Sequence, residues 1–231
     1  MSRFRTIQAV LLSCLVSVAA VGTLAADDFE EGSYPSIDGV KGAFNFIKHF
    51  DREQYKWSYK SKWMTYNNMY LDGMDFSYYC GHGIRYIIQQ KDGAILDLRT
   101  AGGTSSLGLG DRDLEFLVIH ACQTVPSPLE VMDWWSAWVG PKGIFDGLHQ
   151  TLGYRTNYYL DTAASVASLF GYQMKRGGAV WQSWFNVLDR FSDPQHHGCA
   201  VMHPSCELDT YRTWAADPPR DHRNLRVWWQ Y

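Results

Sequence analysis

Two short apolar runs, each of which stops at residues with reactive side chains, constrain the fold of this chain more than any other feature. Residues 74–79 (MDFSYY) lead into the sequence CGHG, which contains His82, and residues 114–119 (LEFLVI) lead into HACQ, which contains Cys122. A run of about six residues rich in β-branched and aromatic side chains is too short for a typical helix. Because neither run alternates strictly between apolar and polar residues, each is predicted to be a strand covered on both faces of a sheet.

The ends of these two strands are where we expect chemistry. In open α/β sheets, functional groups gather at the edge where the strands have their carboxyl ends. If both runs belong to one parallel sheet, His82 and Cys122 lie side by side at that edge. An imidazole beside a thiol is the minimum apparatus for a cysteine nucleophile.

The composition is that of one globular domain. The chain has 231 residues, of which 46% are hydrophobic and 19% are charged, so it can bury a sizeable core. No internal repeat, linker or low-complexity segment divides it. Strands alternate with helical patterns, which predicts a three-layer sandwich around a mostly parallel central sheet. We assign residues 26–231 to this single domain.

Periodicity and turn signals predict the other elements. Apolar residues at helical spacing begin at Ser36 or Asp38 and reach Phe50, which predicts a helix over one face of the sheet. The sequence KDG at residues 91–93 predicts a hairpin turn. The remaining predictions are a helix over 129–138, a strand over 148–154, helices over 162–173 and 179–190, and a last strand over 198–202.

Two segments are predicted to be loops. Residues 28–35 look like an acidic, flexible lead-in to the first helix. Residues 100–110 (TAGGTSSLGLG) are glycine-rich, but a strand follows them, and a phosphate cradle requires a helix at that point. We therefore predict a mobile loop near the site and no phosphate-binding loop.

The first 25 residues have the features of a secretory signal peptide. Arg3 and Arg5 precede an apolar stretch over residues 9–21, and Thr23-Leu24-Ala25 is a plausible cleavage site. The mature protein is then secreted or periplasmic. A retained membrane anchor is the rival, but the stretch is short for a span of about 20 residues. A lipoprotein cleavage at Cys14 is less favoured, because the apolar run continues past it.

Charge excludes some classes of partner. Removal of residues 1–25 takes away two arginines and no acid, which moves the formal net charge from −3 to −5. There is no basic stripe of the kind that neutralises phosphates, so we expect no nucleic acid. There is no long basic amphipathic helix for a membrane surface, so we expect no stable membrane insertion after cleavage. The oligomeric state is left open.

Four cysteines remain after cleavage of residues 1–25. In an oxidising compartment an even number favours pairing, and Cys199 and Cys206 are the natural disulfide pair. A metal site built on these thiols with His196, His197 and His203 is less favoured, because a Cys-x6-Cys spacing is not a usual zinc knuckle. We therefore expect no metal and no cofactor. Cys80 is expected to be buried and unpaired.

Other side chains compete with His82 for the role of base. His120 lies two residues before Cys122 on the same strand and points to the same side, but the rise of about 6.6 Å is long for a direct proton transfer. His149 is a third candidate if its strand neighbours that of Cys122. Gln123, next to the thiol, is a further accessory candidate.

The two motifs together resemble those of the caspase-like cysteine peptidases, a group that includes caspases, gingipains, legumain, clostripain and separase. In that family an apolar strand ends in His-Gly, here His82-Gly83, and a later one ends in Ala-Cys, here Ala121-Cys122. The resemblance covers residues 36–204 and implies a caspase-like fold with His82 as base or proton donor and Cys122 as nucleophile. It also implies that the amides of Gly83 and Cys122 are the oxyanion donors.

Departures from the caspase pattern leave the substrate open. Gln123 follows the cysteine, whereas caspases have a glutamine before it, and no residue of a specificity pocket can be aligned. The leading expectation is an exported peptidase that forms an acyl-enzyme with a peptide or a small acyl substrate. One alternative is an acyl transferase or cyclase that uses the same pair, and another is an inactive relative that binds a ligand or partner.

Overall fold

The computed structural model describes residues 29–51, 53–101, 108–139, 143–191, 195–219 and 224–231. The predicted signal peptide and most of the predicted glycine-rich loop lie outside these residues. Within them, no helix has both the length and the hydropathy needed to cross a membrane.

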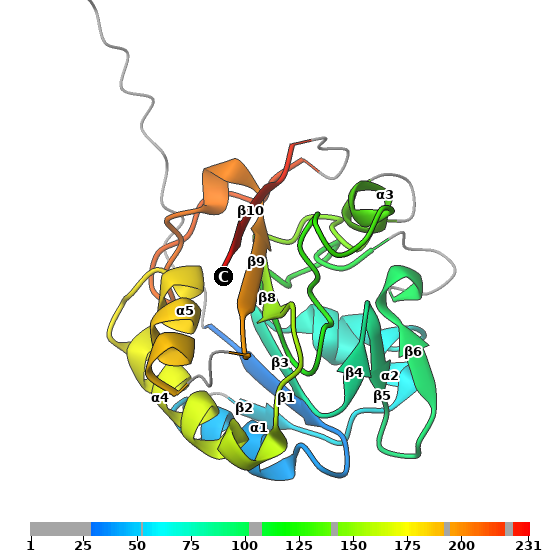
Figure 1. The fold of residues 1–231 in the computed structure, drawn as a ribbon, viewed down its shortest axis with the longest axis vertical. Coiled ribbons are helices and arrows are strands. Elements are labelled where there is room, and N and C mark those ends of the chain that lie inside the picture. The colour runs from blue at the N-terminus through cyan, green and yellow to red at the C-terminus, as the bar shows by residue number, and fades with distance from the viewer. Residues whose placement is uncertain (1–28, 52, 102–107, 140–142, 192–194, 220–223) are drawn as a thin grey trace, which may run out of the picture.

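A seven-stranded sheet forms the centre of the molecule, in the order β10-β9-β8-β7-β3-β1-β2 (Figure 1). The pairs β1–β2, β1–β3, β3–β7 and β7–β8 are parallel, whereas the pairs β8–β9 and β9–β10 are antiparallel. The predicted mostly parallel α/β sheet is therefore confirmed. The strands are β1 (Glu31–Pro35), β2 (Glu53–Tyr55), β3 (Phe76–Cys80), β7 (Phe116–His120), β8 (Gln150–Tyr154), β9 (Gly198–Met202) and β10 (Arg226–Trp229).

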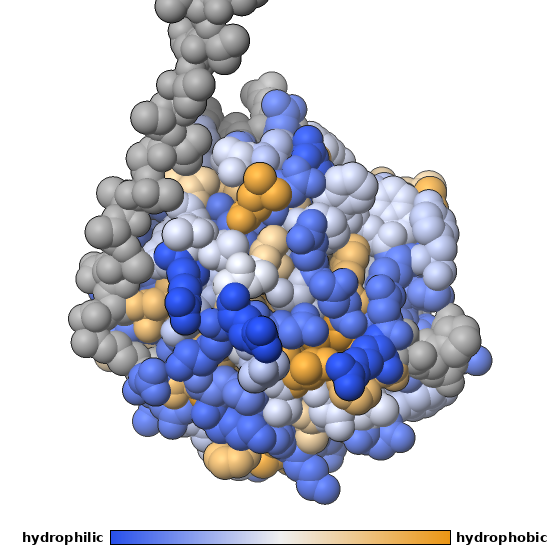
Figure 2. All heavy atoms as spheres, turned by 90° about the vertical axis from the view of Figure 1, so that its left-hand side faces the viewer, coloured by the Kyte–Doolittle hydropathy of each residue, from blue (hydrophilic) through white to orange (hydrophobic). Residues whose placement is uncertain are grey.

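Helices cover one face of the sheet. They are α1 (Val40–Ile47), α4 (Ala163–Lys175) and α5 (Val180–Phe191) (Figure 1). Their apolar sides form one buried cluster with β3 and β7, in which the Phe46 ring stacks on Tyr78 at 4.3 Å between centroids. The side that these helices turn to solvent is mostly hydrophilic, with scattered apolar patches (Figure 2). This division is what an amphipathic helix on a sheet requires.

Shorter elements cover the other face. A small antiparallel sheet of β4 (Gly83–Ile84), β5 (Ile87–Gln89) and β6 (Ile95–Asp97) lies there with α2 (Lys60–Trp63) and α3 (Trp134–Trp138) (Figure 1). The predicted hairpin is confirmed, with Gly93 at φ 81° in its turn. Single-turn 3₁₀ helices span Asn67–Met69, Leu71–Gly73, Leu98–Thr100, Leu160–Thr162 and Pro204–Cys206.

Three predictions about these elements are wrong. The segment predicted as a flexible lead-in over 28–35 contains Glu31–Pro35, which is a fully buried strand between β2 and β3. The helix predicted over 129–138 is confined to Trp134–Trp138. The strand over 198–202 is not the last strand of the chain. β10 follows it, pairs with it and forms an exposed edge of the sheet.

Burial of an acid in the first strand sets a testable pH dependence. Glu31 is fully buried and accepts a 2.6 Å hydrogen bond from the Tyr211 hydroxyl. Burial raises the pKa of Glu31 from 4.5 to about 7, although the Tyr211 hydrogen bond opposes this rise. Because the folded-state pKa is raised, the carboxyl contributes stability at low pH that is lost as the pH rises through about 7.

We expect the neutral variant Glu31→Gln to gain stability relative to the wild type between pH 5 and pH 8. The expected gain is about 1–3 kcal/mol, since one pKa unit corresponds to about 1.4 kcal/mol. Urea unfolding of both proteins at the two pH values measures it. His120 makes the stability depend on pH in the opposite direction, because burial lowers its pKa to about 3. This contribution is present in both proteins and cancels when they are compared. A difference in stability that does not change with pH would contradict the prediction.

Candidate active site at the carboxyl edge of the sheet

The two strands that were predicted to carry the reactive residues are neighbours in the sheet. β3 and β7 pair in parallel, with Cys80 opposite His120 at their last positions. Beyond the strands, the Gly81 amide donates a 3.2 Å hydrogen bond to the His120 carbonyl. Since His82 and Cys122 each follow these paired residues by two positions, both belong to the same edge of the sheet.

The two turns that follow the strands pack directly against each other. A Cβ atom at Gly83 would lie 2.4 Å from Cγ2 of Thr124 and 3.0 Å from Cβ of Ala121. Only a residue without a side chain therefore fits between the turn of His82 and the turn of Cys122. This close approach gives a physical reason for the glycine after His82.

Cys122 is the accessible thiol among the cysteines that the structure describes. Its side chain is half-buried, whereas Cys80, Cys199 and Cys206 are fully buried. Burial raises the pKa of Cys80 to about 12, so that thiol stays protonated, buried and unpaired as predicted. The Cys122 Sγ lies 3.1 Å from the carbonyl oxygen of Tyr158 and 3.3 Å from its amide nitrogen.

His82 contacts an acid that the sequence analysis missed. Its Nε2 lies 2.9 Å from Oδ2 of Asp38, and both side chains are about half exposed. Asp38 stands just before α1, in the turn that follows β1, and so belongs to the same sheet edge. A carboxylate that orients a catalytic imidazole is the third member of a nucleophile, base and acid arrangement.

His120 lies beneath the edge and has no access to solvent. Its Nδ1 is hydrogen-bonded to the Tyr78 hydroxyl, and its ring lies 4.4 Å from that of Tyr158 between centroids. Burial lowers the pKa of His120 to about 3, so the ring stays neutral. These contacts are those of a structural residue that supports the segment touching Cys122.

His149 lies away from the thiol, although its strand β8 neighbours the strand of Cys122, the condition on which it was a candidate. His149 immediately precedes β8, and the first residue of β8, Gln150, is opposite Phe116 at the start of β7. Because β7 and β8 are parallel, His149 lies at the amino edge of the sheet. Cys122 lies at the carboxyl edge.

Gln123 connects the candidate site to a neighbouring cavity. Its backbone has a positive φ of 53°, its amide donates 2.9 Å to the Thr156 carbonyl, and its Nε2 donates 2.9 Å to Oδ1 of Asn157. Strained backbone of this kind clusters at functional sites. The cavity holds about 300 Å³, and its lining includes Arg85, Gln123, Glu130, Arg155, Thr156 and Asn157.

The predicted disulfide is absent because the structure separates its two cysteines. Both thiols are free. Cys199 pairs with Gly153 near the end of β8, whereas the Cys206 carbonyl accepts a hydrogen bond from the side chain of Gln150 at the start of β8. Cys199 and Cys206 therefore lie beside opposite ends of β8. Their short spacing in sequence does not bring the two sulfur atoms together.

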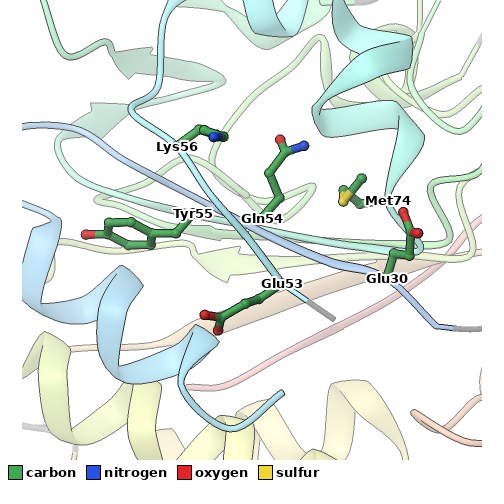
Figure 3. Close-up of a pocket in the computed structure, with 6 residues that line it drawn as sticks. All are labelled: Glu30, Glu53, Gln54, Tyr55, Lys56 and Met74. Carbon is green, nitrogen blue, oxygen red and sulfur yellow. The ribbon is translucent and has the colours of Figure 1, made fainter. Parts of the chain in front are cut away.

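A larger surface hollow lies away from these residues. It follows the edge strand β2, holds about 460 Å³ and is lined by Glu30, Glu53, Gln54, Tyr55, Lys56 and Met74. Glu53 and Gln54 point to opposite sides of the strand (Figure 3). The lining contains neither a thiol nor an imidazole, so this hollow offers none of the groups of a cysteine nucleophile.

The contact between Asp38 and His82 gives a first prediction for this site. We expect Asp38→Asn to slow the alkylation of Cys122 by about tenfold. This effect is smaller than that expected for loss of the His82 imidazole, because the pair of Asp38 and His82 is exposed to solvent. Labelling rates of the wild type and the variant, measured under the same conditions, report it. The matched control is Asp51→Asn, beyond the carboxyl end of α1. An Asp38→Asn protein that is labelled as fast as the wild type would contradict the orienting role.

Comparison with known proteins gives a family without a known role. The family model described as "Domain of unknown function (DUF6345)" matches residues 25–218. No curated protein matches the chain. Because the match extends over most of the sequence, the chain belongs to the DUF6345 family.

Proposed function

We propose that this protein is a cysteine-dependent hydrolase of caspase-like type, which cleaves peptide bonds through an acyl-enzyme on Cys122. The observation that carries the proposal is the pairing of β3 with β7, with Cys80 opposite His120. This pairing brings His82 and the accessible thiol to one sheet edge, which is the arrangement that the resemblance to caspase-like peptidases implies. The proposal extends to an exported enzyme, as the predicted signal peptide suggests.

The proposed reaction uses only groups of this edge. His82 takes the thiol proton as Cys122 Sγ attacks the carbonyl carbon of the substrate. The amides of Gly83 and Cys122 stabilise the oxyanion. His82 then protonates the leaving amine, and a thioester remains on Cys122. Water, deprotonated by His82, attacks the thioester and releases the acid and the thiol.

The cavity beside Gln123 is the proposed binding site for a substrate side chain. Its lining carries the guanidinium groups of Arg85 and Arg155 and several amides. The Arg155 guanidinium is already paired with Glu130 and donates 2.6 Å to the Gln230 carbonyl, which leaves Arg85 as the cation that faces a ligand. We therefore propose a polar or acidic side chain for this position and not an apolar one.

Peptide cleavage tests the proposed function. The purified chain is incubated with a peptide mixture in the presence of a reductant, and the products are identified by mass spectrometry. We expect cleavage by the wild type, none by Cys122→Ala, and a preference for acidic or polar residues that Arg85→Ala weakens. Capture of the acyl group by an added amine would redirect the assignment to acyl transfer. Absence of any Cys122-dependent product would contradict a catalytic role.

A further inference from the structure

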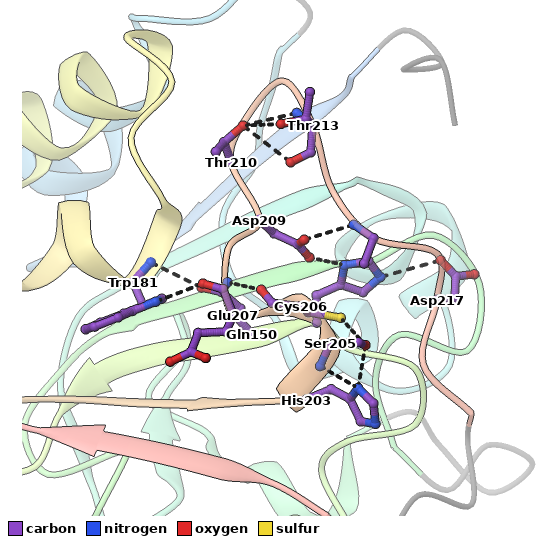
Figure 4. Close-up of polar contacts among 12 residues, drawn as sticks. Gln150, Trp181, His203, Ser205, Cys206, Glu207, Asp209, Thr210, Thr213 and Asp217 are labelled. Carbon is purple, nitrogen blue, oxygen red and sulfur yellow. Dashed lines mark hydrogen bonds and ion pairs between the residues drawn. The ribbon is translucent and has the colours of Figure 1, made fainter. Parts of the chain in front are cut away.

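A second group of chemically reactive side chains lies at the opposite, amino edge of the sheet. Glu115 directly precedes β7 and His149 directly precedes β8, and the His149 amide donates 2.8 Å to the Glu115 carbonyl. The segment that follows β9 brings Cys206, Asp209 and Asp217 to the same place. Asp209 and Asp217 approach from different sides of the group (Figure 4). The proposed hydrolase reaction uses none of these residues.

The contacts of the His149 ring give the two nitrogens different roles. Nδ1 lies 2.7 Å from Oδ2 of Asp209, and both side chains are almost fully buried. Nε2 has no hydrogen-bond partner among the described residues, although Oδ1 of Asp217 lies 3.5 Å from it as an ion pair. A carboxylate that holds one ring nitrogen while the other is presented to a cation is the usual support of a metal-binding histidine.

Glu115 is the independent sign of a ligand. The residue is only 8% exposed, and its Oε2 has no hydrogen-bond partner within the described part of the chain. A buried polar atom is normally paired, because an unpaired one has lost its hydrogen bonds to water without replacement. The ligand atoms of Glu115, His149 and Asp217 all lie within 4.8 Å of one another. A cation placed among them would contact both Oε2 of Glu115 and Nε2 of His149, the two atoms that lack a hydrogen bond to any described residue.

We propose that Glu115, His149 and Asp217 bind a divalent transition-metal ion of the zinc class, with Asp209 as the residue that positions the His149 ring. Imidazole together with carboxylates favours such ions over calcium or magnesium, which prefer oxygen ligands alone. Three protein ligands leave a coordination position open. Asp217 has a side chain that is 71% exposed, so that position is accessible to solvent.

A second arrangement of donors is less favourable. Cys206, His149 and Asp209 also lie within 4.8 Å of one another. A metal ion bound there through Nδ1 would have to replace the 2.7 Å hydrogen bond between His149 and Asp209. The site formed by Glu115, His149 and Asp217 keeps that hydrogen bond and uses the two atoms that lack hydrogen bonds.

Zinc binding by the full chain, without an affinity tag, tests the proposal. Isothermal titration with Zn²⁺ is expected to show one site per chain, with much weaker binding of Ca²⁺ and Mg²⁺. Asp217→Asn is the principal variant, because its exposed position leaves folding intact. We expect it to weaken Zn²⁺ binding at least about tenfold, and Asp209→Asn to weaken it about 10–100-fold, the range for residues that support a ligand. Glu115→Gln, checked for folding by circular dichroism, is expected to abolish the site.

Two control variants distinguish this site from zinc binding by surface acids or by the thiol of the candidate active site. Asp113→Asn removes an exposed acid only two residues from Glu115 and is expected to leave Zn²⁺ binding unchanged. Cys122→Ser is also expected to leave it unchanged, since that thiol lies at the other edge. The proposal is overturned if the wild type binds no Zn²⁺, if Asp113→Asn weakens binding as much as Asp217→Asn, or if Cys122→Ser or Cys206→Ser abolishes binding while Asp217→Asn retains it.

Discussion

Replacing His82 by alanine is expected to slow acylation of Cys122 by about 100-fold or more, the range for loss of a general base. His82 follows β3 at the sheet edge where Cys122 follows β7, and Asp38 lies 2.9 Å from its Nε2. The rate of covalent labelling of Cys122 by a peptide-based electrophile measures the effect. Folding of the variant is checked by circular dichroism, and the exposure of His82 makes a large loss of stability unexpected.

His120→Ala is the matched control for His82→Ala. His120 is fully buried against Tyr78 and Tyr158, so its removal leaves a cavity and is expected to destabilise the fold. At a temperature where this variant is still folded, we expect its labelling rate to stay close to that of the wild type. If a folded His120→Ala protein is unlabelled while His82→Ala reacts normally, the base is His120 and not His82.

The second large effect is expected at Gly39, where α1 begins against the end of β3. A Cβ atom there would lie 1.8 Å from the carbonyl oxygen of Cys80 and 2.3 Å from its carbonyl carbon. The same carbonyl accepts a 3.0 Å hydrogen bond from the Ser36 amide, so neither backbone segment moves freely. We expect Gly39→Ala to lower the free energy of unfolding by about 3 kcal/mol, at the upper end for overpacking, and to displace Asp38 from His82.

Gly93→Ala provides the comparison for Gly39→Ala. Gly93 has a positive φ of 81°, and a Cβ atom there would meet nothing within 4 Å. Its replacement tests backbone strain alone, with an expected loss of about 1 kcal/mol. Urea unfolding of the two variants measures the difference. Equal losses would mean that the contact between Gly39 and Cys80 does not constrain the fold.

The central strands were predictable because apolar side chains dominate them. β3 and β7 are buried on both faces, and their sequences contain few polar residues. α4 and α5 were predictable because their apolar residues recur along the sequence and form the buried side of each helix. β1 was missed because Glu31, Gly32 and Ser33 give a polar sequence whose side chains are nevertheless buried. The burial of a carboxyl depends on partners such as Tyr211, which lies 180 residues away and cannot be identified from local pattern.

The site was predictable only where it follows directly from a strand. His82 and Cys122 follow two recognisable strands, so their placement at one edge could be inferred. Asp38 lies 44 residues before His82 and meets it only through the fold. His149 was a candidate because its strand could neighbour that of Cys122, but a neighbouring strand does not determine at which edge of the sheet a residue lies. The disulfide prediction is wrong for a similar reason. Cys199 and Cys206 are close in sequence, but they lie beside opposite ends of β8.

Covalent trapping tests the central claim most directly. The full chain is treated with a peptidyl acyloxymethyl ketone under reducing conditions, and the modified residue is identified by intact-mass measurement and peptide mapping. We predict a single adduct on Cys122, absent in Cys122→Ser and at least about 100-fold slower in His82→Ala. Simple alkylation of unfolded protein serves as the control for thiol content. An adduct on another cysteine, or equal rates in the wild type and His82→Ala, would contradict the assignment of Cys122 and His82 as a catalytic pair.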